Sequence, residues 1–93
     1  MYAPGENGDY TMKILVNIHI PAISKQYDVL VPSKLRIRSI LPLIASAVAE
    51  LSGHVYVVSG EECLCALEKD VLLRPNATLE QYGIRNGDHL VMM

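Results

Sequence analysis

The sequence has no tryptophan and no phenylalanine, and its only aromatic side chains are five tyrosines in 93 residues. Hydrophobic residues nevertheless make up 51% of the chain, so the core must be built from Ile, Leu, Val and Ala, with tyrosines and methionines as extras. A chain of this length forms one small domain that buries only about 60 to 65% of its unfolded surface. Neither a large internal active-site cavity nor an aromatic ligand pocket is expected.

An excess of positive charge is also missing. Eight Lys and Arg residues stand against ten Asp and Glu residues, which gives a net charge of -2. Because nucleic-acid binding usually requires a clear positive excess, we expect no nucleic-acid partner. The one dense basic cluster is Lys34, Arg36 and Arg38, and acidic residues gather between Glu61 and Asp70. Each cluster is either a solvated surface or a charged docking patch.

Cysteine is scarce, with only Cys63 and Cys65 in the chain. On a strand their spacing places both thiols on one face, about 7 Å apart, and a disulfide between such neighbours would be strained. The three histidines, His19, His54 and His89, show no zinc-type spacing. We therefore expect buried or half-buried free thiols in a reducing compartment, no metal and no cofactor.

Long hydrophobic runs are absent, because Lys, Arg, Glu and Pro interrupt every candidate before about 18 residues are reached. Residues 1–11 are polar and contain glycine, unlike a signal peptide, which is basic and then apolar. We interpret residues 1–11 as a flexible leader, residues 12–93 as the domain, and the protein as cytoplasmic without membrane insertion. Whether the leader is a genuine extension, an alternative start or an expression remnant stays open.

Residues 13–20 are rich in β-branched side chains that recur at every second position, which is typical of a half-buried strand. The positions expected to face the core are Ile14, Val16, Ile18 and Ile20. After a turn at 21–25, residues 26–32 alternate again, with Tyr27, Val29 and Val31 on one face. Two such strands joined by about five residues predict an antiparallel hairpin.

Apolar residues then recur at three- and four-residue spacing, which predicts an amphipathic helix that ends at Gly53. The apolar face consists of Ile40, Leu41, Leu43, Ile44, Ala47, Val48 and Leu51. Pro42 would cost about 3 kcal/mol inside a helix. We therefore expect Arg38 or Ser39 to be the N-cap, which places Pro42 in the first turn. The helix should pack across one face of a sheet.

Two β-type segments follow the helix, residues 55–59 and 63–68. We predict that 63–68 is an edge-proximal third strand and that 55–59 is an extra strand or hairpin arm. Residues 71–75 should form a short fourth strand that is ended by Pro75.

The last segment combines a short helix, a turn and a strand. Thr78 can cap a single helical turn, and Gly83 supplies the positive φ that ends it. Asn86, Gly87 and Asp88 then turn the chain into a final apolar strand at 89–93.

The order of hairpin, helix, strands, one-turn helix and last strand is that of the α+β ubiquitin-like β-grasp fold. This fold has a mixed four- to five-stranded sheet, with one main helix across one face and a short one-turn helix before the last strand. The helix-opening Leu41-Pro42 and the turn Gly-Ile-x-Asn-Gly-Asp-x-Leu at 83–90 resemble the YukD/EsaB group of small bacterial ubiquitin-like proteins. They also resemble the cytosolic ubiquitin-like domain of EccD. Both groups are associated with type VII secretion.

The resemblance implies a cytosolic accessory protein or regulator that docks on a secretion ATPase or membrane component. It also implies that the protein performs no chemistry of its own. Ligation or sulfur transfer would require a flexible C-terminal Gly-Gly, whereas this sequence ends in Leu90-Val91-Met92-Met93 directly on a predicted strand. The residues offer no nucleophile with a base, no paired carboxylates and no phosphate loop at usable spacing, so we expect no enzyme.

A protein-binding module is the function that the sequence favours, and a self-associating structural subunit, such as a homodimer, is the alternative. The binding surface could be the sheet face opposite the helix or an edge strand that pairs with a partner strand. We favour the sheet face. Its candidate residues are Lys13, Leu15, His89 and Val91, from two strands expected to lie side by side at the sheet centre.

Overall fold

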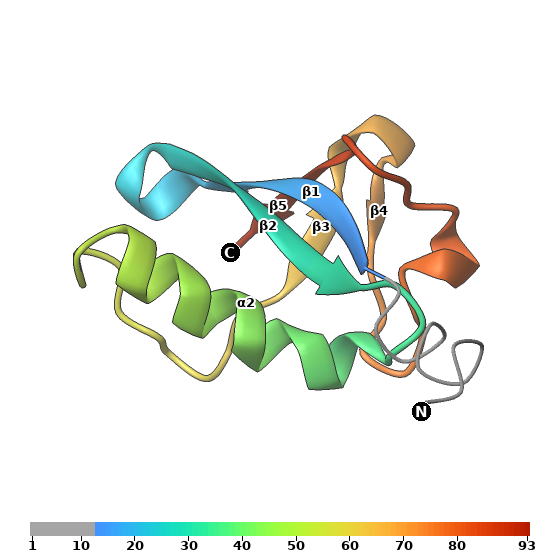
Figure 1. Cartoon of the computed structure of the whole chain (residues 1–93), viewed down its shortest axis with the longest axis horizontal. Coiled ribbons are helices and arrows are strands. Elements are labelled where there is room, and N and C mark those ends of the chain that lie inside the picture. Colours follow the sequence, from blue (N-terminus) through green and yellow to red (C-terminus); the bar gives the residue numbers. More distant parts are fainter. Residues whose placement is uncertain (1–12) are drawn as a thin grey trace, which may run out of the picture.

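The structure is a computed structural model that describes residues 13–93. It contains one five-stranded sheet in the order β2-β1-β5-β3-β4, with one long helix packed against it (Figure 1). This is the predicted ubiquitin-like α+β architecture. The leader predicted at residues 1–11 lies outside the described residues.

The first two strands form the predicted hairpin. Strand β1 spans Lys13–Ile20 and pairs antiparallel with β2, Lys25–Pro32, so that Leu15 lies opposite Leu30. The connection is a single 3-10 turn at Pro21–Ile23, which Ser24 ends in the left-handed conformation. Because alternate side chains point to opposite faces, Val16, Ile18 and Ile20 are fully buried, as predicted. Ile14, predicted with them, is only partly buried against the core.

The helix α2 spans Ile37–Leu51, so it begins earlier than predicted, and Pro42 lies inside it rather than in its first turn. The sequence could not show that a distant loop at residues 75–77 supplies acceptors for the first helical amides. Ile37 N–H donates to the Ala77 carbonyl, and Arg38 N–H donates to that of Pro75. Pro42 is tolerated because it lies on the exposed side of the helix, where water can reach the carbonyl that its missing N–H leaves unpaired.

The helix buries a narrower stripe than predicted. Its buried residues are Ile37, Ile40, Ile44, Ala45 and Val48. Leu43 and Leu51, which we had placed on the core face, are 60% and 56% exposed. After Ser52, the chain leaves the helix through Gly53 and His54, which both have positive φ.

The region between the helix and the last strand differs most from the predictions. Residues 55–59 form no strand, and the third strand, β3, is limited to Leu64–Ala66. A 3-10 turn at Leu67–Lys69 leads into the two-residue strand β4, Val71–Leu72. The chain turns back at Asp70, which has positive φ, and this turn ends the third strand at Ala66, two residues earlier than predicted. The fourth strand begins at Val71 as predicted but ends at Leu72, before Pro75 is reached.

The closing segment follows the prediction. Thr78 and Gln81 exchange hydrogen bonds, since each side chain accepts from the backbone N–H of the other, at 2.9 and 3.1 Å. A 3-10 turn at Glu80–Tyr82 ends at Gly83, whose φ is 72°. The last strand, β5, spans His89–Met92 and lies between β1, to which it is parallel, and β3, to which it is antiparallel.

One hydrophobic core joins the helix to the sheet. Side chains of β1, α2, β3 and β5 meet there, together with Leu79 from the closing segment. The largest fully buried side chains are Val16, Ile18, Ile20, Val31, Ile37, Ile40, Ile44, Val48, Leu64, Leu79, Leu90 and Met92. Because α2 lies along one face of the sheet, the alternate side chains point to the opposite face, which we call the open face (Figure 1).

Candidate protein-interaction surface

The open face is organised in rows that run across the strands, because the strand pairings fix which side chains are neighbours. Asn17 of β1 lies opposite Asp28 of β2 and beside His89 of β5. Asn17 Nδ2 donates to Asp28 Oδ1 at 3.1 Å, and Asn17 Oδ1 lies 3.2 Å from His89 Nδ1. We call these three residues the polar row.

The hydrogen bonds of the polar row determine one another. An ionised carboxylate can only accept, so Asn17 must turn its NH2 group toward Asp28 and its carbonyl oxygen toward His89. The nitrogen of His89 that faces this oxygen must then carry a proton. The three polar side chains therefore have a defined orientation on an exposed surface.

An apolar pair lies next to the polar row. Leu15 on β1 and Leu30 on β2 are direct cross-strand neighbours, and their side chains are 41% and 61% exposed. Lys13, the first residue of β1, lies beyond Leu15 and opposite Pro32. Exposed aliphatic side chains bordered by polar and charged groups are the usual composition of a protein docking patch.

The four residues predicted for this surface are all on the open face, but they are not all close together. Lys13 and Leu15 lie on one side of the polar row, and Val91 lies on the other, level with His19. At about 3.3 Å per residue, the rows of Lys13 and Val91 are about 20 Å apart. Val91 is only 6% exposed, because β5 lies between β1 and β3, which carry His19 and Cys65 on either side of it.

Sequence reasoning missed Leu30, Asn17 and Asp28. Once the hairpin was predicted, the length of its turn could have located them, because the turn determines that Leu15 faces Leu30 and that Asn17 faces Asp28. The parallel pairing of β1 with β5 is different. It depends on residues 72 positions apart, and no local signal determines its register.

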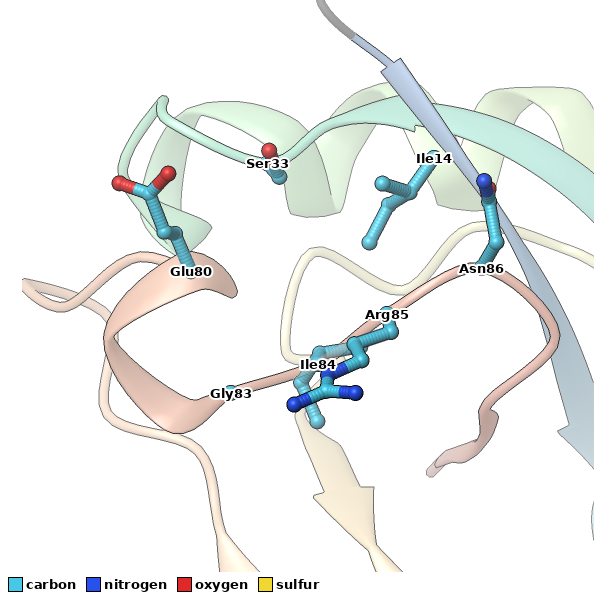
Figure 2. Close-up of a pocket in the computed structure, with 7 residues that line it drawn as sticks. All are labelled: Ile14, Ser33, Glu80, Gly83, Ile84, Arg85 and Asn86. Carbon is cyan, nitrogen blue, oxygen red and sulfur yellow. The ribbon is translucent and has the colours of Figure 1, made fainter.

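A hollow of about 590 Å³ lies between β1, the β2–α2 connection and the segment 80–86 (Figure 2). Ile14 points into it from β1, while the Glu80 carboxylate points away from Ile14. Asn86 borders it and is held in place, because its Oδ1 accepts from Leu15 N–H at 2.7 Å. The lining combines the apolar Ile14 and Ile84 with polar side chains, namely Ser33, Glu80, Arg85 and Asn86.

The two thiols are free and partly buried, as predicted. Burial, and secondly the neighbouring Cys63, raise the pKa of the Cys65 thiol, which keeps it protonated and a weak nucleophile. Within residues 13–93 no hydrogen bond connects His54 to either thiol, and no cluster of three or more His, Cys, Asp or Glu residues could hold a metal ion. No helix in the described part of the chain is long and apolar enough to cross a membrane.

The fold defines a ubiquitin-like domain, and solved structures confirm this class. The EccD5 ubiquitin-like domain from Mycobacterium xenopi superposes with a TM-score of 0.71 at 20% identity, covering 87% of this chain and 92% of that chain. The ubiquitin-like domain of the Mycobacterium tuberculosis type VII secretion system protein EccD1 superposes with a TM-score of 0.70 at 12% identity, with coverages of 87% and 97%. Ubiquitin from Caldiarchaeum subterraneum gives 0.60 at 16% identity, with coverages of 86% and 90%. At sequence identities this low, the superpositions show a likeness of fold alone.

The family follows from the sequence. Residues 15–92 match the family model of YukD, a protein of the WXG100 protein secretion system. The chain therefore belongs to the YukD family and is a secretion-associated ubiquitin-like module. No curated protein sequence matches it.

Proposed function

We propose that this protein is a cytosolic, non-catalytic and non-conjugated docking module of a type VII secretion system. Its partner would be a cytosolic part of a secretion ATPase or of a membrane component. The observation that carries the proposal is the exposed pair Leu15 and Leu30 beside the oriented polar row on the open face. Membership of the YukD family supports the secretion context.

Two polar side chains on this face would set the specificity of docking. Lys13 lies exposed at one end of the apolar pair, and His89 lies exposed in the polar row on the other side. A partner that covers Leu15 and Leu30 would gain apolar burial, while its polar groups would meet Lys13 and His89 at the rim. In this proposal Leu30 takes the place of Val91, which is too deeply buried to make much contact.

The test is affinity capture from the native cell followed by mass spectrometry, with the wild type and a double variant, Lys13→Glu with His89→Glu. We expect the wild type to recover a secretion ATPase or membrane component, and the double variant to lose it because both rim groups change charge. The control is Lys25→Glu with His54→Glu, which makes the same charge change at exposed positions away from the open face and should keep the partner.

Both variants must first unfold at the wild-type temperature, which shows that the fold is intact. Undiminished capture by the Lys13→Glu, His89→Glu protein would exclude this face as the docking surface. Recovery of only an adenylating enzyme would exclude the docking function itself and favour a ubiquitin-like modifier or sulfur carrier.

Self-association is the second candidate function, and the exposed edge of the sheet favours it. Strand β2 is eight residues long, and among residues 13–93 no strand pairs with its outer side. A groove of about 160 Å³ separates it from α2, and the exposed Leu30 and Leu43 border this groove. A second copy could pair with such an edge. Light scattering on the purified protein distinguishes a dimer from a monomeric adaptor.

A further inference from the structure

The loop between α2 and β3 contains a segment, Val55–Val58, that has the composition of a strand but is not in the sheet. Its valines, Val55, Val57 and Val58, are 68%, 76% and 44% exposed. In the part of the chain that the structure describes, the backbone N–H groups of Val57 and Val58 find no acceptor. Apolar side chains and unpaired backbone groups are thus presented together on the surface, which is the requirement for pairing with another strand.

The segment is nevertheless held in position at both ends. At its start, Ser52 accepts from Val55 N–H at 3.3 Å through its carbonyl and from Tyr56 N–H at 3.0 Å through its hydroxyl. At its end, the Glu62 carboxylate accepts from Tyr56 OH and Ser59 N–H, both at 2.7 Å. The same carboxylate also accepts from Gly60 N–H at 3.1 Å. A loop fixed in this way loses little conformational entropy when a ligand binds.

A groove of about 250 Å³ lies beside the segment, where the loop runs back along α2 (Figure 1). Val58 forms one wall, and the helix residues Leu41 and Pro42, together with Pro75, provide an apolar lining. Arg38 also lines the groove. The lining offers a place for one aliphatic side chain with a cationic group next to it.

The charge around the groove is uneven. No ion pair of Arg38 is found within residues 13–93, and the backbones of Arg36 and Arg74 lie close to it through contacts with the 75–78 loop. The only acidic group in the lining, Glu62, uses both of its carboxylate oxygens for hydrogen bonds within the loop. An incoming carboxylate would therefore be attracted to Arg38 and repelled by Glu62.

We propose that this groove binds an extended segment of a partner protein in which an acidic residue stands next to an aliphatic one. The backbone of the segment pairs with Val57 or Val58, since the N–H groups of adjacent residues in an extended chain point to opposite sides. Its aliphatic side chain packs on Leu41, Pro42 and Pro75, and its carboxylate faces Arg38. This site lies on the helix side of the molecule and is independent of the docking proposed for the open face.

The test begins with selection of binders from a phage-displayed library of random eight-residue peptides on the full chain. We expect the selected peptides to share an Asp or Glu adjacent to Leu, Ile or Val. Calorimetry with one such synthetic peptide should show affinity at least about tenfold weaker for Arg38→Glu and for Val58→Asp. The matched control, Arg85→Glu, changes an exposed arginine elsewhere and should bind within about twofold of the wild type.

Hydrogen exchange supplies a readout that a nonspecific charge effect would not move. The amide of Val57 or Val58 that faces the bound peptide should exchange at least about tenfold more slowly, because it then has an acceptor. The variant Lys13→Glu with His89→Glu should retain peptide binding, because both residues lie on the open face. A failure of the groove proposal can therefore be told apart from a failure of the open-face proposal.

Four outcomes would each overturn the proposal. The first is that the library yields no acidic-aliphatic binder. The second is that Arg38→Glu and Arg85→Glu weaken binding equally. The third is that the amides of Val57 and Val58 both stay unprotected when the peptide is bound. The fourth is that sedimentation shows a dimer that Val57→Asp dissociates, in which case a second copy of this chain, rather than a partner segment, occupies the site.

Discussion

The hairpin at residues 13–32 and the segment at 53–72 are similar in composition but differ in structure. Both contain β-branched side chains at close spacing, yet the first forms two strands of eight residues and the second forms strands of three and two. In the hairpin, the side chains on one face are covered by α2 and the two backbones pair along their whole length. The valines at 55–58 are 44% to 76% exposed, and no strand within the described residues pairs with them. Strand composition therefore produces a strand only where a pairing neighbour and a buried face are available.

Hydrogen exchange should show the largest difference between the two regions. The Asn17 amide donates to the Asp88 carbonyl at 2.9 Å in the middle of the sheet, so it should exchange only when the domain unfolds. For a domain with ordinary stability, this means slowing on the order of 10³-fold or more. The Val57 amide should exchange at nearly the rate of an unstructured peptide. Similar protection at both amides, measured by NMR on the free protein, would mean that 55–58 is paired after all.

A matched pair of substitutions should show the next largest difference. Val16 is completely buried and Val57 is 76% exposed, so Val16→Ala removes buried methyl groups and leaves a cavity, whereas Val57→Ala does neither. We expect Val16→Ala to lower the free energy of unfolding by about 2 kcal/mol and Val57→Ala to change it by less than about 0.5 kcal/mol. Urea unfolding measures both. Equal losses would show that the valine loop contributes to the core.

The smallest expected effect concerns the carboxylate that holds the loop. Burial alone would raise the pKa of Glu62, but the hydrogen bonds from Tyr56 and Ser59 outweigh it and lower this pKa from 4.5 to about 2. Burial and the same hydrogen bond raise the pKa of Tyr56, so its hydroxyl stays a donor. Replacing Glu62 with Gln should reduce stability at pH 7 by about 1 kcal/mol, a modest value because the group is partly exposed.

The pH dependence of this effect follows from the direction of the shift. Because the pKa of Glu62 is lower in the folded state, its contribution is complete above pH 4.5 and is lost as the pH falls toward 2. The stability difference between the wild type and Glu62→Gln should therefore shrink over this interval, as measured by urea unfolding at several pH values. A difference that stays constant from pH 7 to pH 2.5 would show that the charge of Glu62 does not stabilise the loop.

Local patterns were sufficient to predict much of the fold. Alternation at 13–32 gave the hairpin, and Thr78 with Gly83 gave the closing turn, because in both cases neighbours along the chain make the determining contacts. The predicted start of the helix was wrong, because the amides of Ile37 and Arg38 donate to the carbonyls of residues 77 and 75, which are distant in sequence. The strand predicted at 55–59 was wrong because composition does not reveal whether a partner strand is near.

The candidate surface was predictable only as a face. Alternation placed Lys13, Leu15, His89 and Val91 on one side of the sheet, as the structure has them. Alternation contains no information on the parallel register that puts His89 beside Asn17 and carries Val91 past it to a covered position. The partner of this surface and the participation of each residue in docking stay predictions that the capture experiment tests.

The pairing of β1 with β5 also determines when the domain can fold. In the middle of the sheet Asn17 of β1 pairs with His89 of β5, which is synthesised 72 residues later. Strand β1 therefore cannot complete its pairing until β5 has been made. Until β5 is available, Ile18 and Ile20 have only the hairpin and the helix to cover them. A nascent chain that lacks β5 therefore exposes apolar surface, and any partner that requires the finished sheet can recognise only a fully synthesised domain.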